Sequence, residues 1–477
     1  MPVADIPGNT ATSVELVDRS ATEQLELLKV GDLSAVELLA ACRDRALLTE
    51  PVVNALISVD WDRATDRARA LDSDRSLHRD APLRGLVTAH KDLLDTADMV
   101  TTYGSTVYAD HIPTVNNPLV DVLASAGVVV IGKTNTPEFG AGSHTFNSVH
   151  GVTRNPWDPA RSAGGSSGGA AAALACGSLC VADGSDLGGS IRNPASFCGI
   201  VGFRPSSGTV PGTTSADHRI TMPSNGPMGR CVSDVRILLT AMTGGSAMSP
   251  RVETPRVLFS VDHGDLPVAP AVARLVEQAA RQLEAAGWRI ESGDLPLPSV
   301  DRCFETLRSL AYFLMLPGLL EDSRVKETVR FEIARGMALG EDEIRTAVAD
   351  EILIRTAFDN LFESVDLVLT PTSQVPPFPV GDEWVADVNG VGLAIYTDWM
   401  RSCSRLTVPG GPSISLPAGF TDKGLPIGIQ LSGQRGADAY LLAAAELAEA
   451  VLGTAPRPPI DVLSGFDPAG LPPGPIT

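Results

Sequence analysis

A lysine and two glycine-flanked serines are the residues of this chain best suited to chemistry. Ser166 lies in the stretch 164–169 (GGSSGG), Ser190 in the stretch 186–192 (DLGGSIR), and Lys91 follows an apolar run. A serine hydroxyl is a poor nucleophile until a base removes its proton, and a lysine working through a second serine can replace histidine in that role. The three residues together therefore predict acyl transfer.

Lys91 can act as a base only if its surroundings lower its pKa. An ordinary lysine has a pKa of about 10.4 and is charged at neutral pH, but burial can lower that value by up to about 3–5 pH units. The apolar residues before Lys91 indicate a buried strand, and successive strand residues such as Lys91 and Asp92 point to opposite faces. We therefore expect a neutral lysine and an alkaline optimum of activity.

Gly188 and Gly189, next to Ser190, offer backbone N–H groups without side chains to obstruct them. A substrate carbonyl can approach such amides closely, and donors fixed before the reaction stabilise the oxyanion that forms. Losing one such donor typically costs about 10²–10³ in rate.

These motifs have the order and spacing found in the amidase signature family of serine hydrolases, which the chain resembles from about residue 20 to residue 450. The central block is the most specific part of the resemblance. The matching strings lie at 91–92, 101–105, 132–139, 153–157, 164–169, 186–192 and 194–199, with weaker matches at 369–371 and 415–420.

By position, the resemblance implies that Lys91 is the base, Ser166 the proton shuttle and Ser190 the nucleophile that forms an acyl-enzyme. It also implies a cis peptide bond between Gly165 and Ser166, and a supporting role for Ser167. The implied oxyanion hole consists of the backbone amides of Leu187, Gly188, Gly189 and Ser190.

Two other stretches match known sequence motifs but lack the structural context that those motifs need. Residues 127–134 (GVVVIGKT) fit the phosphate-loop string, but the β-branched residues between the glycines are typical of a strand rather than a loop. Residues 165–169 fit the nucleophile elbow of α/β-hydrolases, which needs a downstream acid and histidine. Only His218 and His263 follow, in unpromising contexts. The histidines show no metal-ligand spacing, so we expect neither a metal nor another cofactor.

Composition narrows the possible partners. The 477 residues are 44% hydrophobic and 20% charged, which is typical of a globular chain with an ample core. The net charge of −20 argues against nucleic acid and against an anionic membrane surface. Residues 1–22 lack a basic and apolar leader, and the seven scattered cysteines suggest reduced thiols. We expect a cytoplasmic monomer or homodimer that acts on a small molecule.

Strands and helices alternate along the chain, which indicates an α/β sheet covered by helices on both faces. The resemblance implies one α/β/α domain over 1–477 around a mixed, twisted central sheet, with a signature core at about 85–205 and a Pro-rich tail at 454–477. A capping box at 34–37 starts one helix. Further helices are expected at 117–125, 170–176, 269–286 and 437–452, and strands at 85–90, 127–131, 178–182, 256–259, 288–291, 366–370, 413–416 and 427–431.

Two variable segments, about 300–320 and 380–404, are expected to shape the substrate pocket. Their aromatic and methionine side chains suit an apolar group, although apolar residues at helical spacing in the first segment also fit core packing. The predicted substrate-binding residues are Tyr103, Gly165, Tyr312, Phe313, Leu316, Tyr396, Trp399 and Met400.

The resemblance implies an amidohydrolase that cleaves small to medium apolar amides, and also carbamates (urethanes) and esters. The alternative is the glutamine-hydrolysing subunit of a tRNA amidotransferase, which liberates ammonia for a partner protein. That subgroup's usual strings are not evident between Thr328 and Ala357. A binding module without activity is disfavoured, because all three catalytic positions are filled.

Overall fold

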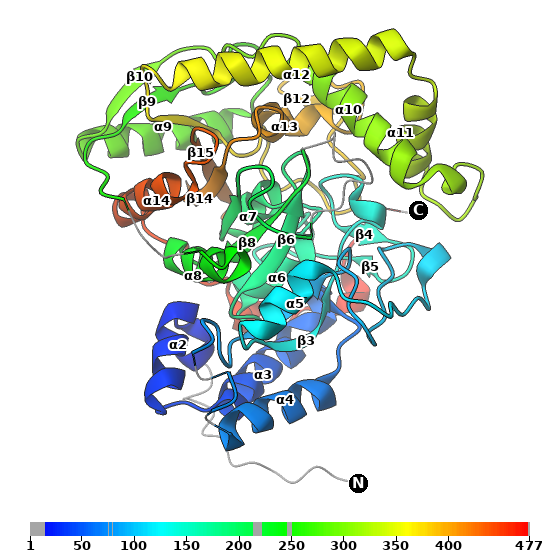
Figure 1. Cartoon of the computed structure of the whole chain (residues 1–477), viewed down its shortest axis with the longest axis vertical. Helices are drawn as coiled ribbons and strands as arrows, with labels where there is room; N and C mark the ends of the chain where they lie inside the picture. Colours follow the sequence, from blue (N-terminus) through cyan, green and yellow to red (C-terminus); the bar gives the residue numbers. More distant parts are fainter. Residues whose placement is uncertain (1–14, 75, 79, 213–221, 246–249, 476–477) are drawn as a thin grey trace.

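A mixed eight-stranded sheet forms the centre of the molecule, in the order β10-β9-β11-β15-β14-β7-β8-β6 (Figure 1). β9 pairs in parallel with β10 and β11, and the other neighbours are antiparallel. The computed structural model describes residues 15–74, 76–78, 80–212, 222–245 and 250–475. The strands are β6 (Ala182–Asp186), β7 (Val201–Arg204), β8 (Ser224–Gly229), β9 (Arg256–Phe259), β10 (Arg289–Ser292), β11 (Leu367–Pro371), β14 (Ser413–Phe420) and β15 (Pro426–Ser432).

A three-stranded sheet, β1 (Leu56–Ile57), β3 (Val129–Thr134) and β2 (Val87–Lys91), lies beside the β6 edge of the large one. The backbone N–H of Cys180, just before β6, donates to the carbonyl of Val87 in β2 at 3.0 Å. β2, which ends at Lys91, is thereby held next to the strand that leads to Ser190.

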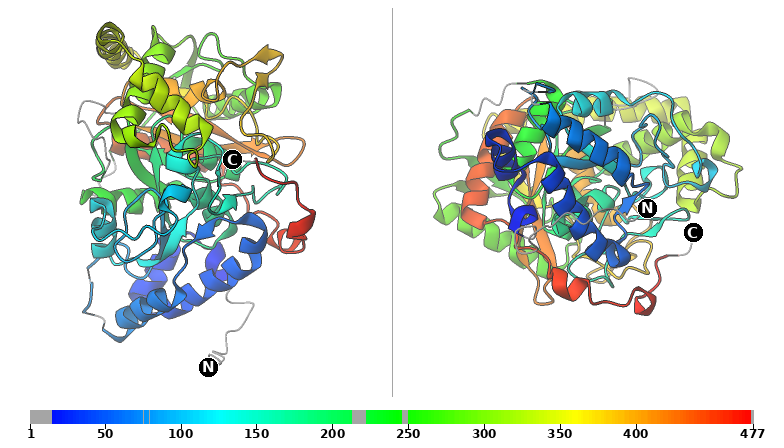
Figure 2. Two further views of the ribbon diagram at one scale, coloured as in Figure 1. Left: turned by 90° about the vertical axis from the view of Figure 1, so that its right-hand side faces the viewer. Right: turned by 90° about the horizontal axis from the view of Figure 1, so that it is seen from below.

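Helices cover both faces of the large sheet (Figures 1 and 2), as the alternation of elements predicts. One layer consists of α8 (Val232–Thr243), α9 (Pro270–Ala285) and α14 (Asp438–Leu452); the other contains α6 (Gly168–Cys176) and α7 (Arg192–Cys198). The lower end in Figure 1 carries α2 (Ala21–Val30), α3 (Ala35–Val53) and α4 (Trp61–Ser73), and α5 (Pro118–Ser125) packs against α8. The upper end carries α10 (Val300–Met315), α11 (Glu327–Met337), α12 (Glu341–Leu361) and α13 (Arg401–Thr407).

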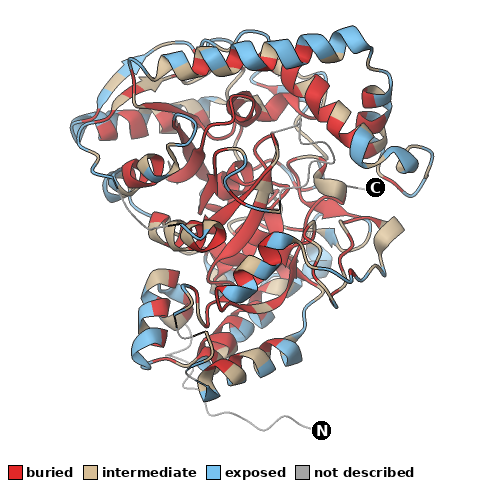
Figure 3. Ribbon diagram, in the orientation of Figure 1, coloured by how far each residue is buried: buried red, intermediate tan, exposed pale blue. Residues whose placement is uncertain are grey.

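The core runs along the central strands and the inner faces of the helices, while the outer faces of α11 and α12 are exposed (Figure 3). α6 consists largely of glycine and alanine, and all of its residues are buried. A Cβ atom on Gly169 would lie 2.6 Å from the carbonyl oxygen of Ala55. Small residues at the start of α6 therefore let the Ser166 loop approach the three-stranded sheet closely.

Most predicted elements are present with shifted ends, but three strands of the large sheet were not predicted correctly. The strand expected at 178–182 runs instead over β6, Ala182–Asp186, while β7 at Val201–Arg204 and β8 at Ser224–Gly229 had no prediction. β6 and β8 are rich in Gly, Asn and Asp, which are depleted in strands. The strand expected inside the phosphate-loop string is present, because β3 runs from Val129 through the second glycine and Lys133 to Thr134.

The remaining elements are short. β4 (Phe146–Asn147) pairs with β5 (Gly151–Val152), and β12 (Asp387–Val388) with β13 (Val391–Gly392). The Pro-rich tail crosses the surface and contains α15 (Ile460–Leu463). No helix within the described ranges is long and apolar enough to cross a membrane. His218 and residues 1–14, which entered the predictions above, lie outside those ranges.

The capping box at the start of α3 allows a test of local stability. Ser34 Oγ accepts from the N–H of Glu37, whose carboxylate accepts from the N–H of Ser34. We expect Ser34→Ala to lower the free energy of unfolding by about 1 kcal/mol, measured by urea denaturation. Ser34→Asp can still cap the helix and should lower the free energy of unfolding much less. Equal decreases in the two variants would contradict the capping argument.

Candidate active site

Lys91 ends β2 with its side chain fully buried, and its Nζ lies 2.7 Å from Ser166 Oγ. Burial lowers the pKa of Lys91 to about 7, although the negative charges of Asp186 and Asp183 oppose that decrease. A large fraction of Lys91 is therefore neutral near pH 7, as a base requires. Asp92 turns away and accepts hydrogen bonds from the N–H and hydroxyl of Thr102.

The contacts of Lys91 also orient its lone pair. Nζ lies 3.3 Å from the carbonyl oxygen of Ser185 and 2.9 Å from Ser185 Oγ. A neutral amine has two N–H donors and one lone pair. If both donors point to the oxygens of Ser185, the lone pair faces Ser166 Oγ and can accept the proton of its hydroxyl. Ser185 was not among the predicted site residues.

The Ser166 loop is fixed from several sides. The peptide bond between Gly165 and Ser166 is cis, as the resemblance implies. The carbonyl of Gly165 accepts from Ser143 Oγ at 2.9 Å, and that of Gly164 from Thr145 Oγ1 at 2.8 Å. The N–H of Ser167 donates to the carbonyl of Ser190 at 3.0 Å. Ser167 thus joins the two serine loops, which fits the supporting role predicted for it.

The four amides proposed for the oxyanion hole differ in their partners. The N–H of Gly189 donates to Asp186 Oδ1 at 2.8 Å, so this donor is already engaged. Among the residues that the structure describes, the N–H groups of Leu187, Gly188 and Ser190 have no hydrogen-bond partner. Those three donors can receive a substrate oxygen, whereas Gly189 helps to hold the loop in shape.

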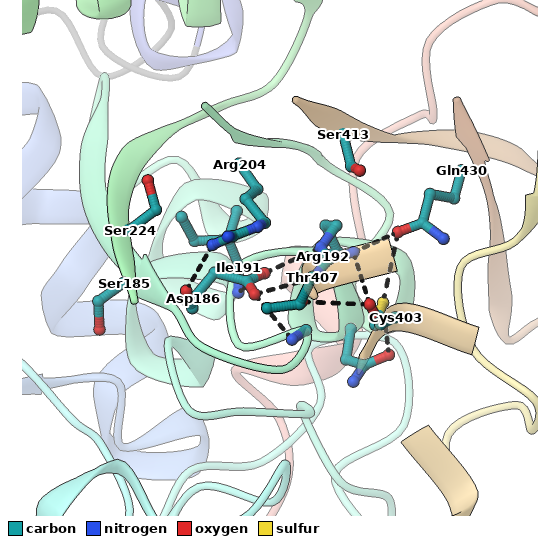
Figure 4. Close-up of polar contacts among 12 residues, drawn as sticks. Ser185, Asp186, Ile191, Arg192, Arg204, Ser224, Cys403, Thr407, Ser413 and Gln430 are labelled. Atoms are coloured by element: carbon teal, nitrogen blue, oxygen red, sulfur yellow. Dashed lines mark hydrogen bonds and ion pairs between the residues drawn. The ribbon is translucent and has the colours of Figure 1, made fainter. Parts of the chain in front are cut away.

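A buried ion pair fixes the loop that carries Ser190 (Figure 4). Arg192 donates from Nη2 to Asp186 Oδ1 at 2.8 Å and from Nε to Oδ2 at 3.0 Å, and both side chains are inaccessible to solvent. Burial alone would raise the pKa of Asp186, but Arg192 outweighs it and holds that pKa well below its usual range. Arg192 also donates to the carbonyl of Cys403 and to Gln430 Oε1, so the loop is tied to α13 and β15.

A cavity of about 560 Å³ opens onto Ser166 and Ser190. Its wall is mainly apolar and aromatic, and Tyr103 stacks on Phe139 with ring centroids 6.3 Å apart. Arg308 is the only lysine or arginine among the described lining residues. The apolar and aromatic lining residues are Leu93, Leu94, Tyr103, Tyr108, Phe139, Leu187, Pro223, Tyr312, Met315 and Leu316.

Of the predicted substrate-binding residues, Tyr103, Tyr312 and Leu316 line this cavity and five do not. Phe313 packs beside Val329 and Ile333, and Trp399 lies between Phe197 and Phe378. Most of the large side chains among the other five pack against apolar side chains instead. The five residues outside the lining are Gly165, Phe313, Tyr396, Trp399 and Met400.

Arg308, which lines the cavity, and Tyr396, which does not, form a buried polar group. Arg308 Nη2 donates to the hydroxyl of Tyr396 at 2.8 Å, and Nε donates to Glu332 Oε1 at 3.0 Å. Arg308 was missed because its setting in α10 gives no sign that an ion pair brings it to the cavity. The lining residues Tyr108 and His111 were missed as well, and they follow Tyr103 closely in the sequence.

Comparison with known proteins identifies the family. The family model for amidases matches residues 37–442, most of the chain. This chain belongs to the amidase family. A glutamyl-tRNA(Gln) amidotransferase subunit from Moorella thermoacetica is 34% identical to it over 475 residues, covering 91% of this chain and 96% of the relative.

Solved structures of amidase signature enzymes share the fold. A bacterial aryl acylamidase superposes with a TM-score of 0.86 at 25% identity, covering 95% of this chain and all of the other. The corresponding glutamyl-tRNA(Gln) amidotransferase subunit from Thermotoga maritima gives a TM-score of 0.72 at 26% identity, covering 93% and 98% of the two chains. The protein is thus an amidase signature hydrolase that acts on carbon–nitrogen bonds.

The pKa of Lys91 predicts the pH dependence of the reaction. Because the base must be neutral, we expect kcat/KM to rise with pH through an acid limb near pH 7 and to level off above it. A pH–rate profile between about pH 5 and 10 measures this limb. A profile that stays flat across that range would argue against a lysine base.

The absence of a side chain at Gly188 is open to a direct test. A Cβ atom there would lie 2.7 Å from Phe304 Cζ, and Phe304 is buried. We expect Gly188→Ala to displace the oxyanion donors and lower kcat by about 10²-fold or more. Phe304→Leu shortens the opposing side chain. Gly188→Ala should therefore lower kcat less when it is introduced into Phe304→Leu than when it is introduced into the wild type. No recovery would mean that Phe304 is not the obstacle.

Proposed function

We propose that the protein hydrolyses small to medium apolar amides through an acyl-enzyme on Ser190. Ser190 Oγ attacks the substrate carbonyl while its proton passes through Ser166 to neutral Lys91. The relay then returns a proton to the leaving nitrogen, and water releases the acyl group by the reverse path. The observation that carries the proposal is the 2.7 Å contact between buried Lys91 and Ser166, in a cavity that also opens onto Ser190.

The cavity supports an apolar substrate. Its aromatic and aliphatic wall suits an aryl or alkyl group, and its volume of about 560 Å³ lies within the range of small-molecule sites. The similar fold of a bacterial aryl acylamidase agrees with such a substrate. Carbamates and esters present the same carbonyl carbon to Ser190, and an ester needs less help from the proton relay because its leaving group is better.

A second candidate function is the glutamine-hydrolysing subunit of a tRNA amidotransferase. The sequence comparisons favour it over the first, because the Moorella thermoacetica amidotransferase chain is 34% identical over almost its whole length. The charges in the cavity argue the other way. Free glutamine carries an α-carboxylate, and Arg308, the one lysine or arginine in the described lining, is already paired with Glu332 at 3.0 Å.

Matched aryl substrates and L-glutamine distinguish these functions. We expect the purified chain to hydrolyse an aryl amide, and the matching carbamate and ester, while it releases no ammonia from glutamine. Ser190→Ala should lose at least about 10³-fold in kcat. Ser167→Ala, in the neighbouring loop, is the control and should lose far less, because its backbone N–H contact to Ser190 remains.

Two outcomes would overturn the proposal. Ammonia release from glutamine without hydrolysis of any aryl substrate would establish the second candidate function. Full activity in Ser190→Ala would show that another residue is the nucleophile.

A further inference from the structure

A buried hydrogen-bonded pair, His90 and Asp183, lies next to the proposed base. His90 Nδ1 is 2.7 Å from Asp183 Oδ2, and both side chains are inaccessible to solvent. The other carboxylate oxygen, Oδ1, accepts from the backbone N–H of Lys91 at 2.9 Å. One carboxylate therefore holds two successive residues of β2, and the second of these is Lys91.

This contact joins the two sheets. Asp183 belongs to β6 in the large sheet, whereas His90 and Lys91 belong to β2 in the three-stranded sheet. Ser185, two residues after Asp183 on the same strand, contacts Lys91 Nζ at 2.9 Å. β6 thus fixes the backbone of Lys91 at one position and its amino group at another.

The hydrogen bonds of His90 indicate which member of the pair carries charge. Nδ1–H donates to Asp183, while Nε2 is buried and has no partner among the described residues. A second proton on Nε2 would have no acceptor there, and an unpaired buried donor is costly. One ring proton, on Nδ1, therefore satisfies the hydrogen bonding of His90, and Asp183 is among the negative charges that act on Lys91.

Charged groups on several elements surround this part of β2. Asp186 is paired with Arg192 at 2.8 Å and is the first of the two carboxylates that act on Lys91. Lys133, on β3, has its Nζ 3.0 Å from Thr96 Oγ1, and the negative charges of Asp92, Asp183 and Asp95 favour its charged form. Asp183 is the second carboxylate that acts on Lys91, and its negative charge favours the ammonium form of Lys91.

We propose that the Asp183–His90 pair is a positioning device for Lys91: it fixes the backbone of the base and adds to the negative charge around its amino group. The pair thereby helps to set the lower end of the pH range in which the enzyme works. This inference rests on the proposed role of Lys91 as the base.

The experiment follows the reaction of Ser190 with an alkyl fluorophosphonate, so it needs no knowledge of the substrate. Ser190 Oγ bonds to phosphorus, fluoride leaves, and the serine proton passes to Ser166 and Lys91. Asp183→Asn keeps the shape of the side chain but removes one of the two negative charges that favour the ammonium form of Lys91. We expect the acid limb of the phosphonylation rate to move down by about 1 pH unit.

Asp234→Asn is the matched control. Asp234 is also a fully buried carboxylate, but it lies on α8, receives a hydrogen bond from the N–H of Thr22, and is not among the charges that act on Lys91. We expect its loss to leave the acid limb where it is in the wild type. A general effect of removing a buried charge would instead shift both variants alike and would overturn the inference.

A pair of His90 variants keeps the test valid if Asp183→Asn fails to fold. His90→Asn places an amide N–H near the position of Nδ1 and should keep the wild-type limb. His90→Leu removes the donor, favours the uncharged form of buried Asp183, and should move the limb in the direction expected for Asp183→Asn. Identical limbs in the two variants would contradict the inference.

The two proposals fail in distinguishable ways. A wild-type labelling rate with no acid limb between about pH 5 and 9 would remove Lys91 as the base, and this inference with it. A wild-type limb near pH 7 that stays in place in Asp183→Asn would leave the base in its role and overturn only the role of Asp183.

Discussion

The active-site region depends on carboxylates carried into the core by a single strand. β6 is short and polar, yet it lies at the edge of a buried sheet and brings both Asp183 and Asp186 out of water. A buried charge is tolerated only where it is paired and hydrogen-bonded. Asp186 meets this condition through Arg192 and the N–H groups of Gly189 and Ile191. The loop that carries Ser190 takes its shape from those bonds.

The pKa of Lys91 results from two opposing effects, burial and the nearby carboxylates. Full burial favours the neutral amine, while Asp186 and Asp183 favour the ammonium, and the resulting pKa is about 7. Without the carboxylates, burial would lower the pKa of Lys91 further. Without burial, the amino group would keep its usual pKa and stay charged. The nearby Lys133, buried among three carboxylates, has a pKa of about 8.

Sequence patterns predicted the parts of this site whose signals are local. Glycines flanking Ser166 and Ser190 and the apolar run before Lys91 are visible along the chain, as is the capping box of α3. Contacts between distant segments left no such signal. Asp183 lies in a strand with low β propensity, so the strand was expected four residues too early. Arg308 comes to the cavity only because Glu332, on another helix, provides its counter-charge.

The substrate pocket likewise depends on contacts that are not local in the sequence. Apolar composition does not reveal whether a side chain faces a cavity or another side chain, and Trp399, which suits an aromatic substrate, is used instead to pack Phe197 and Phe378. The segment at 300–320 contributes Tyr312, Met315 and Leu316 because α10 turns its C-terminal end toward the cavity. The same helix supplies Phe304, whose ring requires a glycine at position 188. One helix therefore shapes the apolar wall and constrains the loop of oxyanion donors, so a change of specificity in α10 also acts on the catalytic backbone.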